Sequence, residues 1–524
     1  MGPLQTVTEN EVKLGAHATF VLPDLVGGIV GDVPGEADDG PQPSVVDLGE
    51  RTLSATYWDT ADLRLIRSGI SLRHRSASDG SERGWTVKLP VAGDGGPALS
   101  RSEVAFTGSD SAPPADAVSL VTATTRGRHL EPVARLVTKR RRHHVLDADG
   151  RVALEVADDE VSVMEGRRVA ARFRELEVEL APSDNDGERL LPLVVGRLRG
   201  AGAGAPDPTP KIARALGPQA LAAADVTVGV VGPRSSAGDA VQAAIAAGTL
   251  RLVAHDPGVR LGGDDEDVHQ ARVATRRLRS DLATFRSLLD EAWVTHIRGE
   301  LYWLAGELGA VREADVLLAR LQRHTSELEG PDAVAATALL RTLDAERANA
   351  RSRAGDALAT ARYAAVLDQL VGASRMPPLT VDAARRASEV VPVRVGKAWA
   401  HLAKAVDQVG DDTPIELLHE VRKKAKRCRY ACEAATSVCG KEAKRLGAAV
   451  AEIQGVLGDL QDAAVAEAWL RSRAVGLTGA GAAARAFSAG LLTGMQQRAA
   501  EEAIRTWRGA WKEASDKKLR KWLD

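Results

Sequence analysis

The sequence predicts an α+β protein in two parts: a β-barrel with a charged interior, then an all-α bundle built from a duplicated helical unit. Three observations lead to this fold class. The chain changes near residue 225 from short strand-like segments to Ala-, Leu- and Arg-rich helical ones. Several strand segments place charges on one face and apolar residues on the other. A basic motif in the helical part recurs at an offset of 150 residues.

Length and composition limit the number of domains and the class of protein. The chain has 524 residues, enough for roughly two to four domains, and 27% charged residues, as in soluble globular proteins. The net charge of −2 argues against a general polyanion binder of the histone type. Neither a secretory signal nor an apolar stretch long enough to span a bilayer is visible, so we expect a cytoplasmic protein. The three cysteines follow neither disulfide nor zinc spacing and are expected to be buried.

Turn-forming residues divide the chain further. Acidic, Gly- and Pro-rich segments predict loops at Gly31–Pro43 and Ala92–Pro97, and Gly229–Gly238 is typical of a linker. We therefore predict a barrel domain at 1–220, a linker at 221–237 and a helical domain at 238–524. Within the helical domain, amphipathic helices are expected at Val268–Leu289, Trp293–Leu308, Ala314–Glu327 and Leu417–Ser437.

The charged strand faces begin at Glu9, Glu11 and Lys13, which alternate and therefore share one face of a strand. For one strand alone, a solvated face is an equally good explanation. The pattern recurs, however, at Arg73, Arg75, Lys88, Arg101, Glu103, Lys139, Arg141, Glu175, Glu177 and Glu179. Several such strands predict a barrel whose lumen has basic and acidic walls and whose outside is covered by helices.

Such a lumen indicates a specific chemistry. Burying this many charges without a ligand is costly. Arg and Lys neutralise phosphate oxygens, and carboxylates tolerate phosphate when a divalent cation lies between them. The two walls together predict a site for a polyphosphate anion and Mg²⁺ or Mn²⁺.

The helical part contains the repeated basic motif. His269 begins a pattern H-x-x-R-x-x-x-R-R-x-R, and His419 begins a second copy with one Lys for Arg. Each copy is followed by a related segment, Leu308–Val316 and Leu457–Val465, so we predict a bundle with pseudo-twofold symmetry. The basic positions of the two copies are Arg272, Arg276, Arg277 and Arg279, and Arg422, Lys426, Arg427 and Arg429.

Residues 1 to about 215 resemble the CYTH superfamily of triphosphate tunnel metalloenzymes. The resemblance rests on Glu9-x-Glu11-x-Lys13, Tyr57–Thr60, Gly69–Arg75, Trp85–Lys88, Glu175–Glu179 and Lys211 in Thr209–Ile212, all in the family's order. It implies an eight-stranded antiparallel tunnel with flanking helices. It also implies metal-dependent hydrolysis of inorganic triphosphate, thiamine triphosphate or nucleoside triphosphates, or cyclisation of ATP.

The resemblance assigns roles to residues of the tunnel. An acidic residue between Glu155 and Asp159 is expected to join the metal ligands; we assign Asp158, with Glu155 and Asp159 open, and Arg140 can equally replace Arg141. Catalytic roles fall to Glu9, Glu11 and Lys13. The expected metal ligands are Glu9, Glu11, Asp158, Glu175 and Glu177. The expected phosphate-binding residues are Lys13, Arg73, Arg75, Lys88, Arg101, Lys139 and Arg141.

Residues from about 235 onward resemble the CHAD domain, which implies binding of inorganic polyphosphate without catalysis. On a helix, His269, Arg272, Arg276 and Arg279 form one stripe of like charges that an anion would stabilise. A solvated face is the alternative for one stripe, but duplication favours a basic groove. The second stripe adds Lys423, with Lys424 nearby. Nucleic acid is a less suitable partner, because base-stacking aromatics are lacking near the stripes.

These features together predict a hydrolase of inorganic triphosphate whose helical domain binds polyphosphate, with association with polyphosphate granules open. Three alternatives remain: a class IV-like adenylate cyclase, another nucleoside or thiamine triphosphatase, and a non-catalytic polyphosphate-binding protein. No membrane partner is expected.

Overall fold

The computed structural model describes residues 6–27, 42–90, 99–181, 186–262, 265–410 and 414–523, with the backbone alone at 6–9, 99 and 100. All of the predicted loop Ala92–Pro97 and most of Gly31–Pro43 lie outside these ranges. The chain divides into two units, Met1–Asp225 and Val226–Asp524, and the division falls within 221–237, the predicted linker. Each unit is described by itself.

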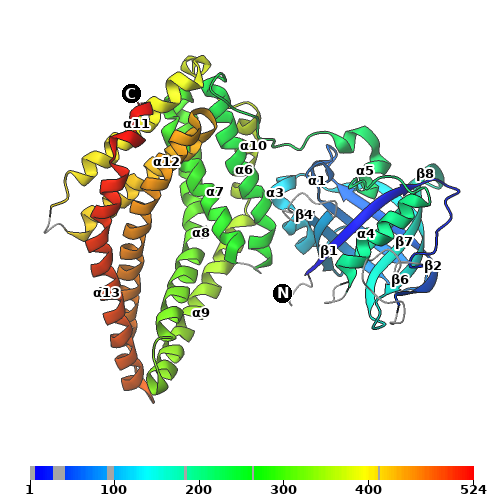
Figure 1. The fold of residues 1–524 in the computed structure, drawn as a ribbon, viewed down its shortest axis with the longest axis horizontal. Coiled ribbons are helices and arrows are strands. Elements are labelled where there is room, and N and C mark those ends of the chain that lie inside the picture. Colours follow the sequence, from blue (N-terminus) through cyan, green and yellow to red (C-terminus); the bar gives the residue numbers. More distant parts are fainter. Residues whose placement is uncertain are drawn as a thin grey trace. The chain divides into compact units, whose positions relative to one another are not determined.

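In the first unit, eight antiparallel strands close into a barrel in the order β1-β5-β4-β3-β2-β6-β7-β8 (Figure 1). Each strand pairs with two neighbours, so the sheet has no free edge. This confirms the predicted antiparallel eight-stranded tunnel. The strands are β1 Thr6–Ala16, β2 Ser44–Asp59, β3 Ser71–Ala77, β4 Arg83–Pro90, β5 Leu99–Phe106, β6 Glu131–Leu146, β7 Val152–Glu165 and β8 Arg168–Leu180.

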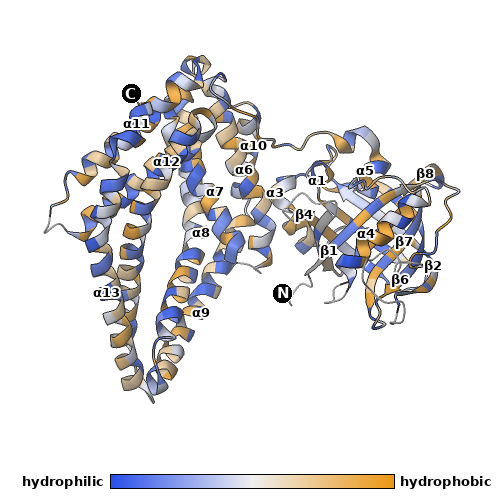
Figure 2. Ribbon diagram, in the orientation of Figure 1, coloured by the Kyte–Doolittle hydropathy of each residue, from blue (hydrophilic) through white to orange (hydrophobic). Residues whose placement is uncertain are grey.

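Short helices flank the barrel. They are α1 Arg64–Arg67, α2 Ala115–Leu120, α3 Thr122–Thr125, α4 Gly187–Gly200, α5 Lys211–Leu216 and the 3₁₀ turn η2 Gly217–Leu221. Hydrophobic residues recur along α4 (Figure 2), and Leu190 and Val194 pack with Leu176 and Val178 of β8 in one buried cluster. The apolar residues of β1, β6, β7 and β8 in this cluster are thereby buried outside the barrel, which leaves the alternate, charged residues directed inward.

The second unit is entirely helical in its described part. Its helices are α6 Ala237–Leu261, α7 Asp265–Thr284, α8 Glu291–Thr325, α9 Gly330–Leu358, α10 Ala361–Arg375, α11 Ala387–Val406, α12 Ile415–Val475 and α13 Ala482–Ala514, with 3₁₀ turns η3 Arg286–Leu288, η4 Val381–Ala384, η5 Lys517–Leu519 and η6 Lys521–Leu523. The starts of α6 and α7 recur 150 residues later as the starts of α11 and α12. The all-α duplicated bundle is therefore confirmed.

Reciprocal backbone hydrogen bonds join the two copies. The N–H of Ala237 donates to the carbonyl of Arg385, and the N–H of Ala387 donates to the carbonyl of Ser235, both at 2.8 Å. Donor and acceptor exchange places between positions that are 150 residues apart. Such an exchange is what a local twofold axis requires, so a pseudo-twofold axis passes between these segments.

Two predicted helix boundaries were wrong. Trp293–Leu308 and Ala314–Glu327 are parts of the single helix α8, because the intervening Gly309 keeps helical geometry and lies against Arg272. The helix predicted at Val268–Leu289 ends at Thr284 and gives way to η3. In the second copy the corresponding break is only a kink at Gly440, where φ is 64°. None of the described helices is both long and apolar enough to cross a membrane.

Candidate active site in the barrel and basic stripes of the bundle

The barrel encloses a charged cavity of about 220 Å³. Every strand contributes a side chain to its lining, and α5 contributes Lys211 and Ile212. Four carboxylates line it: Glu11, Glu155, Glu177 and Glu179. Nine cationic side chains line it: Lys13, Arg51, Arg73, Arg75, Lys88, Arg101, Arg140, Arg142 and Lys211. The described lining thus carries an excess of positive charge suited to an anion.

An acidic wall forms where β1, β7 and β8 are neighbours. The Lys13 ammonium lies 3.1 Å from both Glu11 and Glu177. Lys211 reaches the same wall from α5, at 2.5 Å from Asp159 and 2.9 Å from Glu177. Each ammonium therefore bridges carboxylates from different strands.

These contacts set the protonation of the wall. Burial alone would raise the pKa of Glu177, but Lys211, Lys13 and Arg140 outweigh it and hold this pKa well below its usual range. Burial raises the pKa of Glu175, which Lys211 offsets only in part. Burial would lower the pKa of Lys13, yet Glu177 and Glu11 raise it. The wall is thus a set of mutually compensating charges.

The basic wall lies on β3, β4 and β5. Lys88 and Arg73 both pair with Glu103, the latter at 3.8 Å. Burial and the nearby Arg73 lower the pKa of Arg75 to about 10, although Glu82 forms an ion pair with it. Crowding of like charges at this wall is what an anion would relieve.

The structure of β6 shows that two predicted phosphate-binding residues were wrongly assigned. Lys139 and Arg141 are exposed and point away from the cavity, and Arg141 pairs with Asp47 at 2.7 Å. Arg140 and Arg142 line the cavity instead. Because side chains alternate along a strand, an error of one residue moves the whole basic set to the other face.

The metal ligand predicted on β7, Asp158, was also wrong by one residue. Asp158 pairs with Arg174 at 2.6 Å and does not line the cavity. Asp159 is fully buried and forms a bidentate pair with Arg140, at 2.8 and 2.6 Å. Glu155 lies on the same strand face and lines the cavity.

The other predicted tunnel residues are brought together. Glu11, Lys13, Arg73, Arg75, Lys88, Arg101 and Glu177 all line the cavity, and Glu175 is buried beside Lys211 at 3.1 Å. The side chain of Glu9 lies outside the described part, although its backbone pairs with Arg101. Sequence reasoning missed Arg51 and Arg142; the signal for Arg51 was its even spacing from Tyr57 on β2.

In the second unit, the two basic stripes lie close together. Burial, with Arg276, Arg422, Arg272 and Arg429 around it, lowers the pKa of Lys426 to about 7. Two of these arginines belong to α7 and two to α12, so charges of both copies act on one ammonium. An anion between the stripes would stabilise all of them.

The segments that follow each stripe contact it in matching ways. A Cβ at Gly309 or at Gly458 would lie 3.8 Å from the Nε of Arg272 or Arg422, respectively. The two glycines occupy equivalent places in the repeated downstream segments. At both positions an added Cβ would be in ordinary van der Waals contact with the stripe arginine, so the two contacts match without requiring glycine.

Several stripe residues also have protein partners. Arg272 pairs with Glu313 at 3.3 Å, and Arg277 and Arg429 both pair with Glu433, at 3.3 and 3.4 Å. The other predicted members, His269, Arg279 and His419, are half-buried on the same two helices, whereas Lys423 is exposed and pairs with Glu420 at 2.7 Å. The stripes are thus partly compensated basic surfaces.

Comparisons with known proteins agree with this geometry. The CYTH domain family matches residues 35–189 and the CHAD domain family matches residues 243–471. The uncharacterized protein Rv2226 of Mycobacterium tuberculosis is 33% identical over 461 residues, which cover 82% of this chain and 83% of that protein. The chain is a CYTH–CHAD protein.

Two solved structures are also similar to this CYTH–CHAD protein. PptA from Streptomyces chartreusis is 27% identical, with a TM-score of 0.46, over 53% of this chain and all of that one. The CHAD domain from the plant Ricinus communis is 26% identical, with a TM-score of 0.44, over 54% of this chain and 94% of that one. The CYTH match begins after Glu11 and Lys13, and β1 brings both into the tunnel.

The CYTH tunnel fits a divalent cation in donor type. Among the described residues, no group of three or more His, Cys, Asp or Glu is arranged to hold a metal ion. Glu11 and Glu177, however, lie on either side of the Lys13 ammonium. Carboxylate oxygens are the donors that Mg²⁺ and Mn²⁺ prefer, so these two residues are the candidates to hold the ion.

Proposed function

We propose that the CYTH tunnel hydrolyses inorganic triphosphate with Mg²⁺ or Mn²⁺ and that the CHAD domain binds inorganic polyphosphate. The main support for this proposal is the lining of the tunnel, which contains nine cationic side chains and four carboxylates. A linear triphosphate carries several negative charges, and the basic wall neutralises them. The family supports the coarser conclusion of a triphosphate tunnel protein.

The size of the cavity favours an inorganic substrate. Its volume of about 220 Å³ is below the roughly 300–1,000 Å³ typical of pockets for drug-sized ligands. Tyr57 is the one aromatic residue in the described lining, and it contacts Arg73 at 3.4 Å. A nucleoside would need additional space and a stacking surface. This argues against the adenylate cyclase and nucleoside triphosphatase alternatives.

The residues suggest a mechanism by positioning and electrostatics. Arg73, Lys88 and Arg140 would hold the phosphate chain and stabilise charge in the transition state. Water attacks a terminal phosphorus, the bond to the bridging oxygen breaks, and phosphate and pyrophosphate leave. The water proton would pass to a carboxylate that does not hold the metal; Glu155 and Glu179 line the cavity, whereas Glu175 does not. A bound Mg²⁺ or Mn²⁺ supplies charge neutralisation beside the carboxylates.

A substrate panel tests this proposal. The full chain is assayed with inorganic triphosphate, ATP and thiamine triphosphate, with Mg²⁺ or Mn²⁺, for released phosphate and for cyclic AMP. We expect the highest kcat/KM for inorganic triphosphate and none without metal. Formation of cyclic AMP as the main product would replace the proposal by the cyclase alternative. No turnover of any substrate, with retained polyphosphate binding, would favour the non-catalytic alternative.

A further inference from the structure

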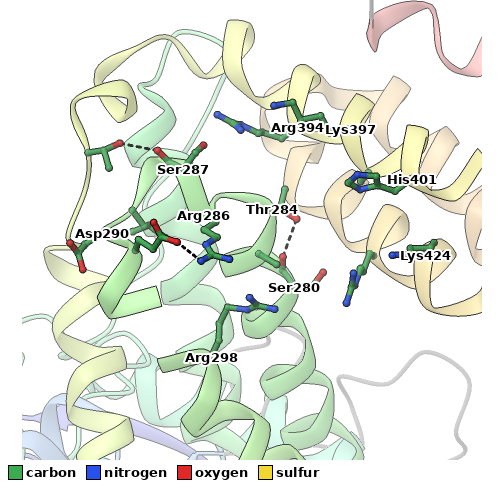
Figure 3. Close-up of a pocket in the computed structure, with 16 residues that line it drawn as sticks. Ser280, Thr284, Arg286, Ser287, Asp290, Arg298, Arg394, Lys397, His401 and Lys424 are labelled. Atoms are coloured by element: carbon green, nitrogen blue, oxygen red, sulfur yellow. Dashed lines mark hydrogen bonds and ion pairs between the residues drawn. The ribbon is translucent and has the colours of Figure 1, made fainter. Parts of the chain in front are cut away.

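The CHAD domain contains a second charged cavity away from the tunnel. Its volume is about 740 Å³, and it lies between the end of α7 and the start of α8 on one side and α11 and α12 on the other (Figure 3). Figure 3 shows Arg298, Arg394, Lys397 and Lys424 reaching toward the same space from these helices. Cationic residues of the lining are Arg286, Arg298, Arg394, Lys397, Lys424 and Arg427, with His401.

Most of the positive charge of this cavity is not compensated by ion pairs among the residues that the structure describes. Its two carboxylates are engaged: Asp290 accepts from the N–H of Trp293 at 2.8 Å, and Glu291 pairs with Arg286 at 2.5 Å. Within the described part of the chain, the other five cations form no ion pair, and the buried Nε atoms of Arg298 and Arg394 have no hydrogen-bond partner. Burial and the nearby Arg427 lower the pKa of Arg298. An anion would remove this repulsion.

The cavity lies on a different helix face from the second basic stripe. At 100° per residue, Lys424 and Arg427 lie roughly 150° around α12 from the centre of the stripe formed by His419, Arg422, Lys426 and Arg429. Arg427, which the sequence pattern groups with the stripe, thus belongs to the cavity. A ligand bound there contacts a face of α12 that the second stripe does not supply, although burial and the nearby Arg298 and Arg427 of the cavity lower the pKa of Arg279 in the first stripe.

Most cations of this cavity are not repeated in the other copy. At the offset of 150 residues, Ala244, Ala247 and Ala274 stand in place of Arg394, Lys397 and Lys424, respectively. At the offset of 149 that relates Gly309 to Gly458, Gly447 stands in place of Arg298, and of the Arg and Lys residues that α11 and α12 contribute to the cavity only Arg427 has a basic counterpart, Arg277. The stripes are duplicated, whereas most of these cations occur in one copy. Their presence therefore does not follow from the repeat that builds the stripes.

We infer that this cavity is a binding site for a compact oligophosphate anion, separate from the groove between the stripes. The surplus of cations around one cavity of about 740 Å³ suits a ligand that carries several negative charges. The described lining contains no Phe, Tyr or Trp side chain, and the His401 imidazole is its one ring, so the lining favours phosphate groups over a nucleotide base. A short linear oligophosphate and a polyphosphorylated polyol share the required chemistry. This site is additional to the binding of long-chain polyphosphate that is proposed above for the CHAD domain.

The test uses the full chain and isothermal titration calorimetry with two probes, inorganic tripolyphosphate and myo-inositol hexakisphosphate. The Arg394→Ala/Lys397→Ala variant should lose one class of site, with affinity lowered at least tenfold for one probe or both. Loss for tripolyphosphate alone identifies a linear ligand, and loss for the inositol phosphate alone identifies a polyol. The matched control, Arg385→Ala/Lys404→Ala, removes two cations of the same region that do not line the cavity and should bind as the wild type does.

Three further measurements ensure that the inference can be rejected. Lys397→Glu reverses a charge at an exposed position and repeats the test if the double variant does not fold. Unchanged affinity for both probes in folded variants overturns the inference. Equal weakening of long-chain polyphosphate also overturns it, because the cavity would then be part of the stripe groove. Triphosphate hydrolysis, measured in parallel, should not change, which separates this inference from the proposed function.

Discussion

Lys211 of α5 places its ammonium 2.9 Å from Glu177 of β8 and 2.5 Å from Asp159 of β7. The lysine follows the last strand of the barrel and returns into the lumen. With three carboxylates around it, its pKa is raised although burial opposes this. Lys211 thus links the closure of the barrel to the charge of the acidic wall, because removal of one cation leaves buried carboxylates without compensation.

Replacement of Lys211 should therefore destabilise the barrel. For Lys211→Met we expect a loss of about 3–5 kcal/mol in the free energy of unfolding, the range seen when one partner of a buried ion pair is removed. Urea unfolding at neutral pH measures this. Lys404→Met, at an exposed site of α11, should change stability by less than about 0.5 kcal/mol. Equal stability of the wild type and Lys211→Met would show that the ammonium does not compensate the wall.

The alternation on β6 provides a matched pair of variants. Arg140→Ala removes a cavity cation that pairs with Asp159, and Arg141→Ala removes an exposed neighbour. If the proposed function holds, Arg140→Ala should lower kcat/KM for triphosphate roughly 10- to 100-fold, as expected for a lost charged hydrogen bond. Arg141→Ala should stay within about twofold. The reverse order would place the opposite face of β6 in the lumen.

The acidic wall is tested at Glu11. Glu11→Gln keeps the size of the side chain and removes its charge, so metal-dependent turnover should fall at least 100-fold while the fold persists. Circular dichroism checks the fold, and titration of Mn²⁺ checks whether the ion binds more weakly. Asp47→Asn, at an exposed carboxylate of β2, is the control. Full activity of folded Glu11→Gln would remove Glu11 from the proposed machinery.

Lys426 gives the CHAD domain a dependence on pH. Its pKa in the folded protein is about 7, below the ordinary 10.5, so the folded state disfavours the charged form. The resulting loss of stability is fully present below pH 7 and disappears as pH rises toward 10.5. A bound polyanion would raise this pKa, so binding at pH 8 should take up a proton. Calorimetry in buffers of different ionisation enthalpy measures that uptake.

Lys426→Arg is the matched variant, because the first stripe carries Arg276 at the equivalent position. Arginine stays charged, so proton uptake should disappear and polyphosphate affinity at pH 8 should not fall. Proton uptake that is unchanged in Lys426→Arg would assign the titrating group elsewhere.

The two proposed activities should be separable. Replacement of Arg272, Arg276, Arg422 and Lys426 by Ala together should remove most of the affinity of the full chain for long-chain polyphosphate and spare triphosphate hydrolysis. In the wild type this affinity should fall as salt rises, by analogy with nucleic acids, because bound cations release counterions. Surviving affinity in the quadruple variant would place the polyphosphate site outside the stripes.

The sequence by itself determined the two-part architecture and much of the tunnel. Alternation of charged and apolar residues, as in Glu175–Val178, fixes which strand face is buried outside and which faces the lumen, since the side-chain period of a strand is two. The recurrence of His269 as His419 fixed the duplication. These are local patterns, and no distant contact is needed to read them.

Tertiary structure decided the register and the partners. In the run Lys139–Arg142 every residue is basic, so no apolar alternation marks the inward face; pairing of Arg140 with Asp159 across β6 and β7 does. The run Asp158–Asp159 was ambiguous for the same reason. The oligophosphate cavity joins Arg298, Arg394 and Lys424 from three helices far apart in the chain. A convergence of this kind depends on helix packing, which a single segment of sequence does not encode.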